Sequence, residues 1–123
     1  MKTNNLQFNR RVALAVLGAA VAFAHTARAA DAPKQVDLVV AGGKLVSGPN
    51  LVKLERNDSV VLTIVSDRAD ELHVHGYNLH AHLQAGRPVT LNFTAKRTGR
   101  FSFELHKSGL ELGVFEIYPK VAK

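Results

Sequence analysis

Cysteine is absent from this chain of 123 residues, and its one methionine is the first residue. Without cysteine the protein forms no disulfide, so a small exported domain must take its stability from a hydrophobic core alone. The same absence excludes thiolate metal ligands, nucleophilic cysteine chemistry and thiol redox chemistry. It also excludes a lipoprotein, because there is no cysteine to carry the lipid.

Long apolar runs are also scarce, and the longest, residues 12–24, is too short to span a bilayer comfortably. It follows the pair Arg10-Arg11 and precedes an Ala-x-Ala cleavage pattern at residues 27–29. We therefore predict a signal peptide over residues 1–29 that directs the chain to the general secretion pathway rather than to the twin-arginine pathway. A retained anchor is the alternative. The mature protein is expected to be periplasmic or secreted, with no membrane contact after cleavage.

Charge of one sign is not in excess once the leader is set aside. Four of the sixteen basic residues lie in the predicted signal peptide, whereas all ten acidic residues follow it, so the mature chain has a net charge of +2. Nucleic-acid binding would need a basic stripe, usually with aromatic platforms, and the sequence has neither. No nucleic-acid partner is expected.

What the mature chain does contain is a series of short runs in which apolar residues alternate. Residues 30–34 read as a flexible lead-in, and residues 35–119 form one domain. Outside the histidine-rich stretch described next, the predicted strands are residues 36–40, 52–54, 60–65, 89–93, 101–105 and 115–117. The run at 60–65 is apolar at nearly every position, which is typical of a central strand covered on both sides. Seven to eight strands without an amphipathic helix predict an all-β, Greek-key β-sandwich.

Residues 70–83 hold four of the six histidines, as two His-x-His pairs on either side of Gly76-Tyr77-Asn78. These three residues are typical of a tight connection, with Tyr77 packing on the edge of the sandwich. If both flanks are strands, period-two alternation separates the histidines from the apolar residues of each flank. The stretch therefore predicts a hairpin with imidazoles on one face.

The register of that hairpin decides which imidazoles meet. With residues 76–79 as the loop, His75 lies opposite His80 and His73 lies opposite His82. Opposed side chains are about 5 Å apart at Cβ, so four imidazoles would share one patch. This patch is a candidate metal site.

The order of several phrases along the mature chain resembles the cupredoxin fold, specifically the secreted bacterial cupredoxin-like domains that contain a His-x-His-Gly-Tyr phrase. The phrases are residues 53–64, Asp70-Glu-Leu-His73, residues 86–93, residues 99–103 and residues 113–117. Together they cover about residues 35–119. The resemblance implies a cupredoxin-like sandwich in the periplasm or outside the cell.

The resemblance also implies where a blue-copper site would lie, and the ligands are mostly missing. His73 matches the first ligand, but the cysteine position falls on Leu105, the second histidine near Ser108 and the axial methionine near Glu111. A copper–thiolate centre and its electron-transfer role are therefore excluded. His106 is the one imidazole in that loop, and in the related fold it would lie near His73.

The candidate metal ligands are the five histidines of the mature chain, which all fall between residues 73 and 106. They are His73, His75, His80, His82 and His106. Neutral imidazoles suit Cu(II), Zn(II) or Ni(II), with Cu(II) first in the affinity order. Glu71 and Glu104, on the same strand faces, would supply a carboxylate ligand or orient an imidazole. The third ligand beside His73 and His75 is either His106 or the His80/His82 pair.

Two hypotheses of different classes follow. The first is a metal-handling module with a type 2 copper site made of nitrogen and oxygen ligands. The second is a metal-free cupredoxin-like domain with an unidentified protein partner, in which the histidines are exposed strand residues. The sequence has no nucleophile elbow, no phosphate-binding loop and no pair of acids in a defined cleft, so no catalytic role is predicted.

Overall fold

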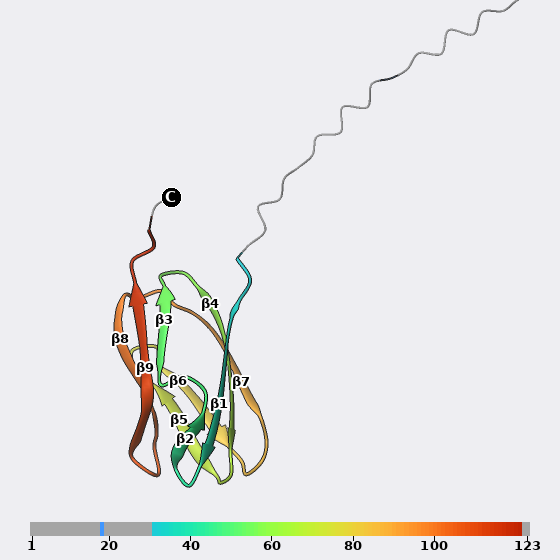
Figure 1. The fold of residues 1–123 in the computed structure, drawn as a ribbon, viewed down its shortest axis with the longest axis vertical. Helices are drawn as coiled ribbons and strands as arrows, with labels where there is room; N and C mark the ends of the chain where they lie inside the picture. Colours follow the sequence, from blue (N-terminus) through green and yellow to red (C-terminus); the bar gives the residue numbers. More distant parts are fainter. Residues whose placement is uncertain (1–17, 19–30, 122–123) are drawn as a thin grey trace, which may run out of the picture.

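The computed structural model describes residue 18 and residues 31–121, and the described residues form nine strands and no helix (Figure 1). The strands are β1 (Lys34–Ala41), β2 (Lys44–Ser47), β3 (Leu51–Glu55), β4 (Ser59–Ser66), β5 (Asp70–Val74), β6 (Leu79–Leu83), β7 (Val89–Thr94), β8 (Gly99–Leu105) and β9 (Leu110–Tyr118). In this part of the chain, no helix has the length and apolarity needed to cross a bilayer. The predicted signal peptide lies outside the described residues, apart from residue 18, and stays a prediction.

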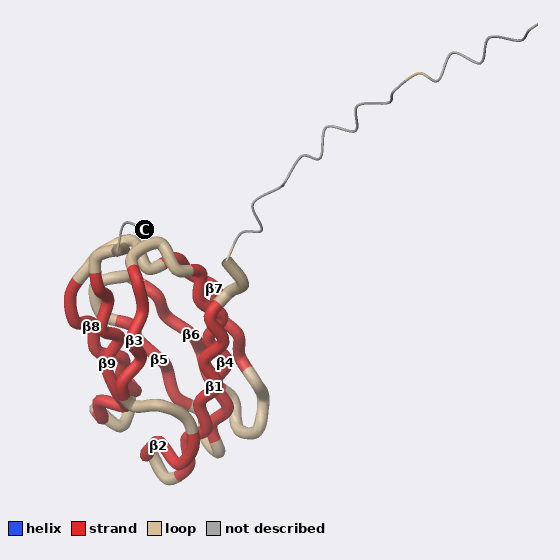
Figure 2. Tube along the Cα trace, turned by 45° about the horizontal axis from the view of Figure 1, so that its top comes forward, coloured by secondary structure: helices blue, strands red, loops and turns tan. Residues whose placement is uncertain are grey.

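The strands form two sheets that face each other, as Figures 1 and 2 show. The four-stranded sheet has the order β2-β1-β4-β7, and the five-stranded sheet has the order β3-β9-β8-β5-β6. Both sheets are mixed, because β1 pairs with β4 and β3 pairs with β9 in parallel. The predicted all-β sandwich is confirmed, with one strand more than the seven to eight expected. The strand without a predicted counterpart is β2, whose four residues show no buried alternation.

The core lies between the sheets and consists of the alternate residues along the strands that face inward. Its largest fully buried side chains are Phe103, Phe115, Leu38, Leu62, Ile64, Leu72 and Leu105. Strand β4 is central, as predicted, because it lies between β1 and β7. Its outer face is half-buried, however, so the expectation that it is covered on both sides is wrong. The outward residues of β4 are Val61, Thr63 and Val65, and β-branched residues of this kind favour strands even where they are only partly buried.

The β5–β6 hairpin forms, but in a register that differs from the predicted one. The loop is residues 75–78, so His73 lies opposite His80, and His82 lies opposite Glu71. In this register Leu79 pairs with Val74 and packs against the core, whereas the predicted register would leave it in the loop. Burial of this side chain explains the choice. Because the two registers differ by an even number of residues, the histidines still share one face.

Two positive φ angles shape the hairpin loop, +79° at Gly76 and +51° at Asn78. Tyr77 extends from the loop onto the edge of the sandwich, as predicted, where its ring contacts Phe93 and Phe101. Its hydroxyl donates to the carbonyl of Arg97 at 3.0 Å. The loop is thus fixed by its own backbone and by an aromatic anchor.

We expect Gly76→Ala to destabilise the protein by about 2–4 kcal/mol. About 1 kcal/mol comes from the left-handed backbone, and the remainder from a Cβ that would collide with the Phe101 ring. Gly86→Ala is the matched control, because Gly86 has φ +73° but open space around a new Cβ. Urea unfolding measures both variants. Equal losses of stability would show that the Phe101 contact does not constrain the loop.

Candidate metal centre

Strand β5 presents Glu71 and His73 on the outer face of the five-stranded sheet. Leu72 and Val74 are completely buried in the core, so alternation turns Glu71 and His73 outward. The His73 side chain is 27% exposed and that of Glu71 is 30% exposed. Both groups are accessible to a metal ion while their backbones are held in the middle of the sheet.

Strand β8 brings an acidic side chain next to His73. In the β5–β8 register, His73 pairs with Glu104 and Leu72 pairs with Leu105. Leu105 is buried, so Glu104 points outward beside His73. The five-stranded sheet therefore places the imidazole of His73 and the carboxylate of Glu104, which are 31 residues apart in the sequence, on the same row.

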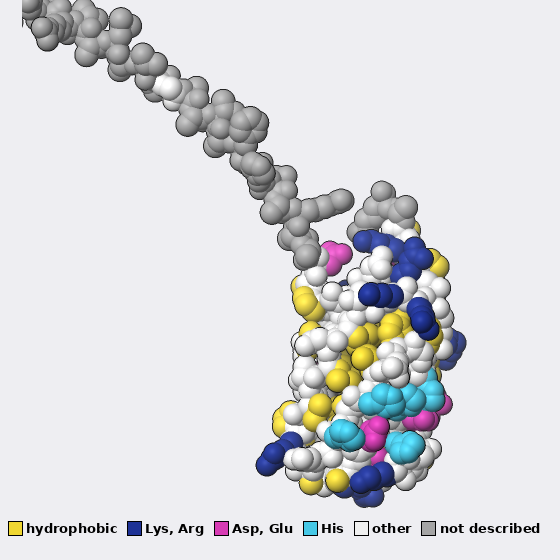
Figure 3. Space-filling model, turned by 180° about the vertical axis from the view of Figure 1, so that it is seen from behind, with side chains coloured by type: hydrophobic (Ala, Val, Ile, Leu, Met, Phe, Trp, Pro, Cys, Tyr) yellow, Lys and Arg dark blue, Asp and Glu magenta, His cyan; other side chains and the backbone are white. Residues whose placement is uncertain are grey.

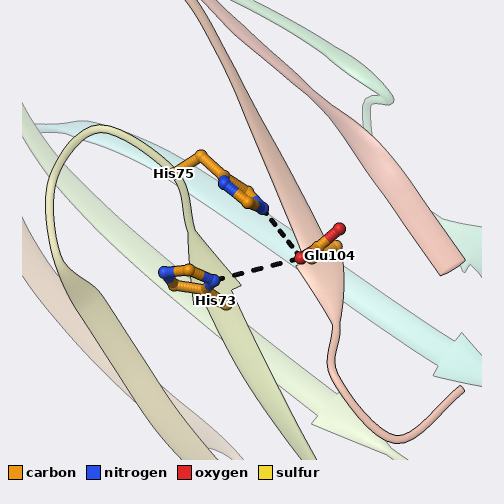
Figure 4. A group of neighbouring side chains, drawn as sticks. All are labelled: His73, His75 and Glu104. Carbon is orange, nitrogen blue, oxygen red and sulfur yellow. Dashed lines mark hydrogen bonds and ion pairs between the residues drawn. The ribbon is translucent and has the colours of Figure 1, made fainter. Parts of the chain in front are cut away.

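His75 completes this arrangement from just beyond the end of β5. Its backbone N–H donates to the Ser102 carbonyl on β8 at 2.9 Å, so the residue stays attached to the sheet although it belongs to the loop. His75 Nε2 lies 2.7 Å from Glu104 Oε1, and His73 Nδ1 lies 3.9 Å from the same oxygen (Figure 4). We call His73, His75 and Glu104 the first group. Its three ligand atoms all lie within 4.8 Å of one another.

A second histidine contact extends the patch onto β6. The His73 and His80 rings are stacked, with centroids 4.3 Å apart and planes 11° apart. His80 Nδ1 lies 3.1 Å from Glu71 Oε1, and His82 Nδ1 lies 3.9 Å from Glu71 Oε2. We call His80, His82 and Glu71 the second group. Figure 3 shows histidine and acidic side chains gathered together at one end of one face of the molecule.

The surroundings of His73 favour its neutral form. Partial burial lowers the pKa of His73 below the ordinary value of 6.5, and repulsion by the neighbouring His80 and His75 lowers it further. The nearby carboxylates of Glu104 and Glu71 oppose this effect without overcoming it. A neutral imidazole keeps a nitrogen lone pair free for a metal ion, so the environment suits a ligand.

His106 lies in the loop between β8 and β9, and its side chain is exposed. Its backbone N–H donates to the Glu71 carbonyl at 2.8 Å, which places the residue beside Glu71 rather than in the first group. The third side chain of the first group is Glu104, which the sequence analysis had named as a carboxylate on the histidine face. His80, one of the two alternatives for a third ligand, lies against His73 in the stacked pair. The choice of a third ligand stays a prediction.

Asp70 is a buried carboxylate for which the sequence analysis had no role. Its Oδ1 accepts the backbone N–H groups of Glu71 at 2.7 Å and Lys107 at 2.9 Å, and its Oδ2 accepts the Ser108 hydroxyl at 3.3 Å. Burial raises its pKa, but these hydrogen bonds and the Lys107 charge outweigh burial, so the pKa lies below 3.8. Asp70 thus ties the β8–β9 loop, and with it His106, to the start of β5. A lone acidic residue at a strand end gives no sequence signal for such a role.

Comparison with solved structures shows which fold this is. Auracyanin B matches with a TM-score of 0.56 at 14% identity, over 73% of this chain and 93% of that one. A purple cupredoxin from Nitrosopumilus maritimus matches with a TM-score of 0.51 at 12% identity, over 68% of this chain and 98% of that one. A chain of a heme-copper terminal oxidase dimer matches with a TM-score of 0.58 at 15% identity, over 68% of this chain. The match spans 64% of the oxidase chain, less than two thirds of its length.

These likenesses establish a cupredoxin-like fold for the described domain, as the sequence predicted. No protein-family model matches the sequence, and comparison with curated proteins gives no significant match. At identities of 12–15% the shared property is the fold. Function must be argued from the residues themselves.

Those residues do not fit a blue-copper centre. Leu105, at the position that the resemblance gives to the thiolate, is fully buried in the core, and the chain has no cysteine. His73 points to the opposite side of the sheet, because its neighbour Leu72 is the residue that pairs with Leu105. The expectation that the loop imidazole of His106 would lie near His73 stays a prediction, because the contact that places His106 is a backbone hydrogen bond to Glu71. The histidine patch is a separate feature on the outer surface.

We expect Asp70→Asn to destabilise the protein by about 1–3 kcal/mol at pH 7, because the amide keeps one uncharged acceptor oxygen in place of two charged ones and presents an NH2 group to the Ser108 hydroxyl. The carboxylate's contribution is fully present above pH 3.8 and is lost as pH falls through the lowered pKa. The stability gap between the parent and the variant should therefore narrow below about pH 4. Chemical denaturation from pH 7 to pH 3 measures it.

Asp37→Asn is the control, since Asp37 is exposed on β1. It should change stability by less than about 0.5 kcal/mol. A gap for Asp70→Asn that stays constant with pH would contradict the assigned role of the buried carboxylate.

Proposed function

We propose that this protein binds copper on the outer face of its cupredoxin-like sandwich, through the imidazoles of His73 and His75 and the carboxylate of Glu104. The observation that carries the proposal is the convergence of these three groups, with ligand atoms within 4.8 Å of one another. They come from β5, the hairpin loop and β8, so the sheet holds them in place. Two imidazoles and one carboxylate are a donor set that Cu(II) and Zn(II) accept.

Copper is favoured over zinc and nickel because Cu(II) binds most tightly to nitrogen and oxygen donors among the divalent ions. When bound, the ion would form a type 2 site, since no thiolate is available to it. Glu104 already orients His75 through the 2.7 Å contact, and its second oxygen is left for another contact. The same carboxylate can therefore hold the imidazole in place or bind the ion directly.

The exposure of the ligands supports metal handling rather than catalysis. His73 and Glu104 are about one third exposed and His75 is 45% exposed, so an ion held there remains accessible to a partner molecule. The proposed role is uptake and delivery of the ion in the periplasm or outside the cell, in accord with the predicted signal peptide. His73 and His75 line an open hollow together with the hairpin loop and Arg97, and these residues form no nucleophile–base pair, so we propose no enzymatic activity.

A metal-free interaction domain is the second candidate, and one observation favours it. The His75–Glu104 contact and the His80–Glu71 contact already give the polar groups of the patch partners in the protein. A polar face that is satisfied in this way does not require a metal to be stable. The patch would then be a surface for an unidentified protein partner.

Calorimetric titration with Cu(II) separates the two candidates. The metal hypothesis requires a dissociation constant smaller than about 10 μM, because a stray surface histidine would account for weaker binding. His73→Ala should weaken binding by about tenfold or more, and Glu104→Gln by a smaller factor, because the amide retains one weaker oxygen donor. Glu55→Gln, an exposed change on β3, is the control and should have no effect. Unaltered affinity in His73→Ala would favour the metal-free domain.

The copper-loaded protein should give a weak type 2 spectrum and lose its metal in acid. Imidazole has an ordinary pKa of about 6.5 and binds either a proton or the ion, so affinity should fall steeply as pH drops through about 6. Absorption spectra and titrations between pH 8 and pH 5 measure both properties. An intense absorption band near roughly 600 nm would indicate a thiolate ligand, which this chain does not have.

A further inference from the structure

The second group, on β5 and β6, has the same composition as the first group, on β5, the hairpin loop and β8: one carboxylate lies between two imidazoles. In the first group Glu104 lies between His75 and His73, at 2.7 and 3.9 Å. In the second group Glu71 lies between His80 and His82, at 3.1 and 3.9 Å, with one carboxylate oxygen towards each imidazole. Each carboxylate thus stands within reach of two imidazoles from the same outer face.

The register of the sheet spreads the two groups over adjacent rows, with His80 of the second group on the row of His73. Because β5 lies between β6 and β8, one row contains His80, His73 and Glu104. The next row contains His82 and Glu71, and the backbone N–H of His106 extends it by donating to Glu71. The stacked rings of His73 and His80 are where the two groups touch.

One ion cannot bind both groups. Nitrogen ligands lie about 2.0–2.1 Å from an ion, so two ligand atoms of the same ion are separated by no more than about 4.2 Å. His75 and Glu71 are four residues apart, which corresponds to about 13 Å along an extended strand. Side chains that stand out from the same sheet face keep roughly this spacing, and His82 lies on the row of Glu71. The outer ends of the patch are therefore independent.

The second group is also more open than the first. The His82 side chain is 89% exposed, whereas that of His80 is 46% exposed and is held by its stacking on His73 and its contact with Glu71. Glu71 is held more firmly, because it belongs to the central part of the sheet and its backbone N–H is bonded to Asp70. The donor set is again two imidazoles and a carboxylate, and the backbone of His106 lies against that of Glu71.

We propose that His80, His82 and Glu71 form a second metal site, so that the protein binds two Cu(II) ions per chain. This inference rests on the proposed function, since it assigns the same class of ion to the neighbouring group. The first site, with ligand atoms already close together, binds tighter. The second, which must draw the exposed imidazole of His82 towards the ion, binds more weakly and exchanges its ion more readily.

Calorimetry and electron paramagnetic resonance with Cu(II) as the probe test this proposal. The parent protein should bind two ions, with magnetic coupling that broadens the spectrum of the doubly loaded form. The double variant Glu71→Gln/His82→Ala should bind one ion with the affinity of the tighter site unchanged, and the broadening should vanish. The matched variant Glu104→Gln/His75→Ala should lose the tighter ion and keep the weaker one. All four changes lie on the outer face, and thermal unfolding without metal checks that each variant folds.

The outcomes separate this inference from the proposed function. One ion in the parent, lost in Glu104→Gln/His75→Ala, would overturn the second site and leave the first intact. Two ions retained in Glu71→Gln/His82→Ala would also overturn it, because the second ion would then bind elsewhere. A parent that binds no Cu(II) would overturn both proposals. Adding His106→Ala to the parent should weaken only the second ion if this imidazole contributes.

Discussion

The histidine patch depends on one constraint, the burial of alternate residues along β5. Leu72 and Val74 are completely buried, and a strand that buries them must turn Glu71 and His73 to the other face. A slip by one residue would bury two ionisable side chains and expose two core residues, which the protein could not compensate. The apolar residues thus fix the direction of the polar ones. The histidine face is a consequence of the core.

The same constraint separates this surface from the internal copper position that the resemblance implies. Leu105 fills that position with hydrocarbon and contributes to the core, so the sandwich is stabilised where a thiolate would otherwise lie. His73 matches the first copper ligand in the resemblance, but its side chain lies on the opposite side of the sheet from Leu105. A fold shared with copper proteins therefore does not carry their site with it.

Much of the fold followed from local patterns, whereas the site followed only in part. Alternation located eight of the strands, but not β2, whose residues are mostly exposed. It also placed Glu71 and His73 on a common face. The pairing of His73 with His80 was not predictable, because the choice between two even registers depends on whether Leu79 reaches the core. That contact is tertiary and leaves no trace in the spacing of the histidines.

The contribution of Glu104 shows why distant strands limit such reasoning. Its place beside His73 requires that β8 pair with β5, although β6 and β7 lie between them in sequence. Asp70 then reinforces this pairing, since its carboxylate binds backbone N–H groups on both sides of the junction. One buried acid thus holds the loop that carries His106 against the strand that carries His73. The backbone beneath the histidine patch is therefore positioned in part by the buried Asp70 carboxylate, which lies outside the patch itself.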